Sequence, residues 1–72
     1  MEFYEILIKG HLDQRRAAWF EGLTLTQLPN GATRLAGAVT DQAALYAILT
    51  RIRDLGLPLL LVERKDEPAE QP

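Results

Sequence analysis

The chain has 72 residues, enough for one small domain that must build a single efficient core. It contains no cysteine, which excludes disulfides and thiolate metal sites and, without a signal-like segment, favours a cytoplasmic protein. The longest apolar run, residues 57–62, is far shorter than the roughly 20 residues that span a bilayer, so we expect a soluble protein with no membrane partner.

The net charge of −2 arises near the C-terminus. Residues 1–64 hold seven basic and seven acidic residues (7 − 7 = 0), whereas residues 65–72 hold one lysine and three acidic residues (1 − 3 = −2). The last stretch also has two prolines and little to bury, which is typical of a disordered segment. We therefore predict a single folded domain over residues 1–64 and a disordered acidic tail over residues 65–72.

The N-terminal third predicts a strand followed by a short helix. Residues 3–9 alternate with period two, which places one set of side chains toward a core. That set is Tyr4, Ile6 and Ile8. Asp13 can then cap a helix over residues 14–21. Because this helix has only about two turns, we expect the packing of Trp19 and Phe20 to hold it.

Residues 23–28 and 33–39 flank Pro29-Asn30-Gly31, which predicts a β-hairpin. A two-residue Asn-Gly loop would split the leucines of the two strands between opposite faces. A three-residue loop, built as a type I turn followed by a left-handed Gly31, pairs Leu25 with Leu35 and gathers the leucines on one face. We therefore favour the three-residue loop.

The segment from Thr40 to Glu63 predicts a capped helix, a glycine stop and a strand. Asp41 can accept a hydrogen bond at the helix start, and Gly56 suits a left-handed position after its end. Apolar residues recur between them at 3.6-residue spacing: Ala44, Leu45, Ile48, Leu49, Ile52 and Leu55. In the strand that follows, we expect Leu60 and Val62 to face the core.

The resulting order is strand, helix, strand, strand, helix, strand. Two β-α-β crossovers joined by a hairpin predict an α+β fold of ferredoxin-like βαββαβ type. Its four-stranded antiparallel sheet would carry two helices on one face, with the last strand at an edge.

Three strings in the chain resemble a widespread family of small uncharacterised bacterial proteins. They are YEI.I.GHLD over residues 4–13, WFEGLTLT over residues 19–26 and DQAALYAILTRIRDLGLPLL over residues 41–60. The resemblance covers nearly all of the chain except the tail. It implies no activity, so it transfers no catalytic residue.

The chain offers few side chains for nucleophilic catalysis, because it has no serine, no cysteine and one histidine. His11 with Asp13 would give two groups at a strand-to-helix turn, which do not make a metal or catalytic site. Small acylphosphatases share the predicted fold and bind anions in the loop after their first strand, but here that loop is short and acidic. We predict no catalytic residue, no metal and no cofactor, and keep an acylphosphatase-like hydrolase as an alternative.

Nucleic-acid binding is a second alternative, because RNA-recognition modules also have this topology. They stack bases on aromatic side chains of the open sheet face, where we place only Phe3. The domain also lacks a positive excess to neutralise phosphates, which argues against a nucleic-acid partner.

The open face of the sheet is therefore the predicted functional surface. We expect Leu7, Leu59 and Leu61 to form an apolar strip there without a covering layer, and such patches mark partner surfaces. The predicted partner-binding residues are Phe3, Leu7, Lys9, Arg34, Leu59 and Leu61. The favoured function is a non-enzymatic interaction or regulatory module that self-associates through this face, most simply as a two-fold homodimer, with another protein as a further possible partner.

Overall fold

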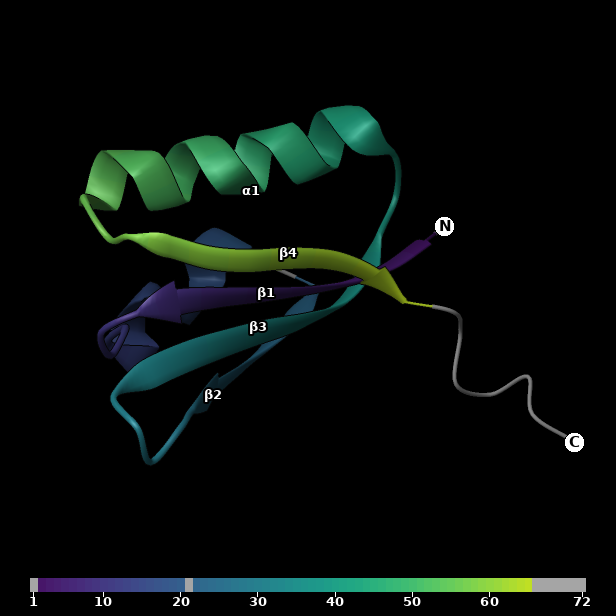
Figure 1. Ribbon diagram of the computed structural model, residues 1–72. Helices are drawn as coiled ribbons and strands as arrows, with labels where there is room; N and C mark the ends of the chain where they lie inside the picture. The colour runs from purple at the N-terminus through teal and green to yellow at the C-terminus, as the bar shows by residue number, and fades with distance from the viewer. Residues whose placement is uncertain (1, 21, 66–72) are drawn as a thin grey trace, which may run out of the picture.

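The computed structural model describes residues 2–20 and 22–65 of the chain. Over these residues the elements are β1 (Glu2–Lys9), the 3₁₀ helix η1 (Gln14–Phe20), β2 (Leu23–Gln27), β3 (Ala32–Val39), α1 (Gln42–Leu55) and β4 (Leu59–Lys65). The strands form one antiparallel sheet in the order β2-β3-β1-β4 (Figure 1). Lys65, placed in the tail by the sequence, is the last residue of β4, and residues 66–72 of the predicted tail lie outside the described residues.

The predicted ferredoxin-like βαββαβ fold with two α-helices is wrong. Within the described residues there is one α-helix, and η1 occupies the place of the expected first helix. Phe20 is only 1% exposed but Trp19 is 43% exposed, so one aromatic side chain, rather than an apolar stripe, anchors the segment. A single anchor does not offset the cost of nucleating two turns of α-helix. The Arg16 N–H instead donates to the Asp13 carbonyl at 2.9 Å, the three-residue spacing of a 3₁₀ turn.

The α1 helix begins and ends where the capping residues predict. The Asp41 carboxylate accepts a hydrogen bond from the Ala44 N–H at 2.9 Å, which satisfies one of the free donors of the first turn. Gly56 follows the helix with φ at 75°, and its N–H donates to the Arg53 carbonyl. That left-handed conformation strongly favours glycine, so the helix ends at Leu55.

The β2–β3 hairpin confirms the predicted three-residue loop. Leu25 lies opposite Leu35 in the ladder, and the Leu28 N–H donates to the Ala32 carbonyl at 2.8 Å. Gly31 has φ at 88°, as the left-handed position after a type I turn requires. This register places the leucines of both strands on the same face as the core of β1.

The core lies between one face of the sheet and the two helical segments. Its β1 members are the predicted Tyr4, Ile6 and Ile8, all buried. Phe20 of η1 and Leu45 and Ile52 of α1 belong to the same cluster, so both helical segments cover the same face (Figure 1). The opposite face carries no helix in the described part of the chain.

Strand β4 is exposed along its whole length. Leu60 and Val62, predicted as core, are 54% and 37% exposed, so this prediction is wrong. Val62 lies opposite the fully buried Ile6 and therefore faces the helical side. The buried residues of α1 pack with β1 and β3. The helix therefore does not fully cover β4, which lies at the edge of the sheet beyond β1.

Candidate interaction surface

The open face presents the alternate residues of each strand, which point away from the core. From the register these are Phe3, Glu5, Leu7, Lys9, Thr24, Thr26, Ala32, Arg34, Ala36, Ala38, Leu61, Glu63 and Lys65. A shallow hollow of about 580 Å³ lies on this face, lined among others by Phe3, Thr24 and Ala36. The small threonine and alanine side chains on β2 and β3 keep the hollow open.

The structure brings three of the predicted partner-binding residues together. Leu7 of β1 lies between Arg34 of β3 and Leu61 of β4, directly opposite each in its ladder. Leu61 is 37% exposed and Leu7 is half-buried, so their contact forms a small apolar centre. Phe3 and Lys9 stand apart from this centre, near the two ends of β1.

The predicted strip is interrupted at Leu59. Regular pairing would place Leu59 opposite Lys9, but an irregularity between Leu7 and Ile8 shifts it opposite Ile8. The Lys9 N–H donates instead to the Pro58 carbonyl at 2.9 Å. Leu59 remains 48% exposed, beyond the end of the regular ladder.

A row of charges crosses the open face next to the apolar centre. Glu5 lies at its middle, 3.8 Å from the Arg34 guanidinium on one side and 3.4 Å from Lys65 Nζ on the other. Lys65 Nζ also lies 3.4 Å from the Glu63 carboxylate. Hydrogen bonds to these two carboxylates raise the pKa of Lys65, and the bond to Glu5 has the larger effect. These ions balance in sign and are solvated, so the row orients side chains but contributes little stability.

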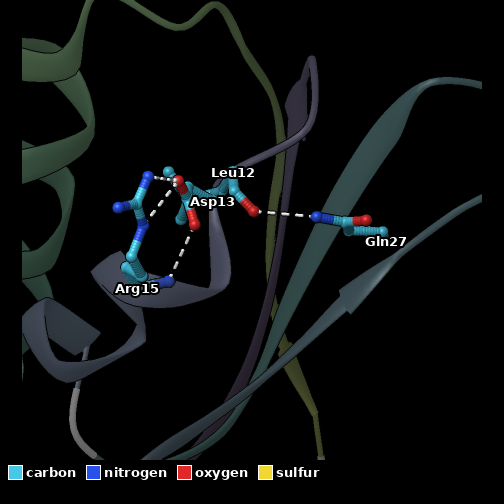
Figure 2. A network of polar contacts seen from close by, with 4 residues as sticks. All are labelled: Leu12, Asp13, Arg15 and Gln27. Atoms are coloured by element: carbon cyan, nitrogen blue, oxygen red, sulfur yellow. Dashed lines mark hydrogen bonds and ion pairs between the residues drawn. The ribbon is translucent and has the colours of Figure 1, made fainter.

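The loop from Gly10 to Asp13 is tied to the β2–β3 hairpin by side chains that lie outside the predicted site. Thr33, fully buried, donates from Oγ1 to the Gly10 carbonyl at 2.7 Å and accepts from the Leu12 N–H at 3.0 Å. Gln27 donates from Nε2 to the Leu12 carbonyl at 2.9 Å (Figure 2). Only the strand period indicates Thr33, because it places this hydroxyl on the core face.

His11 and Asp13 are also engaged in this loop. The His11 Nε2 donates to the Leu28 carbonyl at 3.2 Å, and the Asp13 carboxylate accepts from the Arg15 backbone N–H at 2.9 Å. The Arg15 guanidinium also contacts Asp13, at 3.0 Å (Figure 2). These hydrogen bonds, the side-chain one first, lower the pKa of Asp13. Both residues therefore serve the turn, and their polar atoms are directed at the chain itself.

Metal and membrane signatures are not found among the described residues. Over residues 2–20 and 22–65, histidine and acidic side chains do not gather in threes close enough to hold a metal ion. No helix in the same part of the chain is both long and apolar enough to cross a membrane.

Residues 3–63 match the model of a family described as a domain of unknown function (DUF8691). The chain belongs to the DUF8691 family. The match runs from β1 into β4, so the sheet, both helical segments and the open face all lie within the DUF8691 domain. It confirms the expected membership of an uncharacterised family. No curated protein and no solved structure matches the chain.

Proposed function

We propose that this DUF8691 protein is a non-enzymatic protein-interaction module that self-associates through the open face of its sheet. The observation that supports the proposal is the exposure of large apolar side chains on β4, with Leu59 at 48% and Leu61 at 37%. Water-exposed leucines grouped on one strand are unfavourable in an isolated domain and become favourable once a partner covers them. The resemblance to small bacterial proteins and the lack of cysteine support a bacterial, cytoplasmic origin.

The energy available from the open face alone is modest. Full burial of a leucine side chain is worth about 1.5–3 kcal/mol. On this face Leu61 is the exposed leucine of β4, and covering what remains exposed of it on two copies yields about 1–2 kcal/mol. Association costs about 4–15 kcal/mol in lost freedom. We accordingly expect weak dimerisation unless further apolar surface is buried at the same time.

Sedimentation velocity and light scattering from micromolar to millimolar concentration test the proposal. We expect concentration-dependent dimerisation that Leu61→Lys weakens, because the substitution places an ammonium group in the interface. Thr50→Lys is the matched control, since Thr50 lies exposed on α1, away from the open face. A strict monomer at every concentration would falsify the proposal, as would equal dimerisation of the two variants.

A further inference from the structure

Among the residues that the structure describes, one edge of strand β4 pairs with no other strand. The strand pairs with β1 on one side and is the last strand of the sheet on the other. Every second residue of such an edge strand presents its N–H and C=O groups outward without a strand partner. The seven residues of β4, regular from Leu61 to Lys65 and irregular in pairing before Leu61, therefore offer a template for another strand.

The side chains of this edge lack the usual protection against pairing. Natural edge strands are short, or carry charges or proline at their centre. In β4 the charges stand only at its C-terminal end, and Pro58 precedes the strand. Between them lies the apolar segment of β4, defined by its residues Leu59, Leu60, Leu61 and Val62. All four are between 37% and 54% exposed, on both faces of the sheet.

We propose that two copies of this chain pair their β4 strands antiparallel across a two-fold axis, forming one continuous eight-stranded sheet. The inference rests on the proposed self-association and specifies its geometry: the open faces of the two copies lie side by side along β4, with the open-face Leu61 at the contact, rather than stacked on each other. Pairing of this kind satisfies the outward backbone groups and covers the apolar segment on both faces at once. It thereby supplies the additional buried surface that the open face alone lacks.

The sequence of β4 favours one register. A two-fold axis normal to the sheet keeps the open face of one copy level with the open face of the other. Residues that lie opposite each other must then point to the same face, so their two residue numbers add to an even number. With Leu61 on the axis, Leu61 meets Leu61 of the second copy on the open face. On the helical face, Leu60 then meets Val62 of the second copy, and the symmetry repeats this contact. Every close side-chain pair at the centre is therefore apolar with apolar.

The neighbouring registers are less favourable. With Val62 on the axis, Leu61 lies opposite Glu63 of the second copy, which brings a carboxylate next to the axis. With Leu61 on the axis, Glu63 lies opposite Leu59, farther from the axis. With Glu63 on the axis, two carboxylates lie opposite each other, which is repulsive. With Leu60 on the axis, Val62 lies opposite Pro58 of the second copy, which has no N–H to donate.

Single cysteines test the pairing without interference, because the chain contains none. Residues opposite each other in an antiparallel pair have Cα atoms about 4.5–5.5 Å apart, within disulfide range. We expect Leu61→Cys to cross-link under mild oxidation at least about tenfold faster than Thr24→Cys. Faster cross-linking of Val62→Cys than of Leu61→Cys would overturn the register, and cross-linking of Leu61→Cys no faster than Thr24→Cys would overturn the pairing.

Two measurements on the cysteine-free chain separate this inference from the proposed function. Hydrogen exchange should slow in β4 as concentration rises. Leu60→Lys, on the helical face, should weaken dimerisation at least about tenfold, whereas Trp19→Lys should leave it unchanged. A dimer whose β4 exchange is independent of concentration, or that tolerates Leu60→Lys, would overturn edge pairing while leaving the proposed function standing. A monomer throughout would overturn both.

Discussion

The buried hydroxyl of Thr33 makes a sharp test of how the β1–η1 loop is held. Thr33→Val keeps the shape and the β-branch of the side chain but removes both hydrogen bonds, to the Gly10 carbonyl and from the Leu12 N–H. Each buried polar group left without a partner costs about 1–3 kcal/mol. Because the Gly10 contact is only partly buried, we expect a total loss of about 2–4 kcal/mol.

That loss is large for a domain of this size. At about 0.05–0.15 kcal/mol per residue, the free energy of unfolding of a chain of 72 residues is about 4–11 kcal/mol. Thr33→Val should therefore still fold, but with a clearly lower urea midpoint. Amide exchange at Leu12 should accelerate as well, because its N–H donates to the Thr33 hydroxyl.

Thr26→Val is the matched control, because Thr26 is half-buried on the open face, where its side chain points away from the core. We expect that substitution to change the free energy of unfolding by less than about 0.5 kcal/mol. If Thr33→Val costs no more than Thr26→Val, or if Leu12 exchange is unchanged, the loop is not held by this hydroxyl and the reasoning fails.

Three further predictions concern stability. Phe20→Ala should cost about 3–5 kcal/mol in urea unfolding because the ring is buried, and Trp19→Ala far less; equal costs would contradict the single anchor of η1. Gly37→Ala should lower the melting temperature, since its Cβ would meet backbone leading into β2, and overpacking costs about 1–3 kcal/mol; an unchanged melting temperature would refute that close approach. Hydrogen bonds from Arg15 lower the pKa of Asp13 in the folded state. The ionised Asp13 therefore stabilises the fold above its unfolded-state pKa of about 3.9, and this stabilisation is lost as the pH falls through the folded-state pKa. The urea midpoints of wild type and Asp13→Asn should therefore converge as the pH falls below about 4, and a difference that does not shrink as the pH falls would contradict this assignment.

The parts of the fold that local chemistry decides were predictable. An aspartate before an apolar helical pattern and a glycine after it specify the ends of α1, because each acts on backbone groups within one turn. The hairpin register followed from two constraints together, a glycine that takes a positive φ and leucines that must share one face.

The parts that depend on packing were not predictable. An aspartate such as Asp13 caps the start of an α-helix and of a 3₁₀ helix in the same way. What distinguishes the two here is that Phe20 is buried and Trp19 is not. The irregularity that displaces Leu59 arises where β4 joins β1 and leaves no mark in the residue pattern. Of the predicted site, Leu7, Arg34 and Leu61 therefore meet, whereas Leu59 is shifted out of their register and pairs with Ile8.

The exposure of β4 sharpens what its sequence means. A continuous apolar run such as Leu59 to Val62 is typical of a strand buried on both faces. A strand with one solvent-exposed face instead alternates apolar and polar residues. Here the run lies at the edge of the sheet, where α1 covers neither Leu60 nor Val62 fully. The apolar sequence of β4 is therefore that of a buried strand, although β4 is exposed in a single copy of the chain. A second β4 across that edge removes the disagreement on both faces, whereas stacking of the open faces would cover Leu61 and leave Leu60 and Val62 in water.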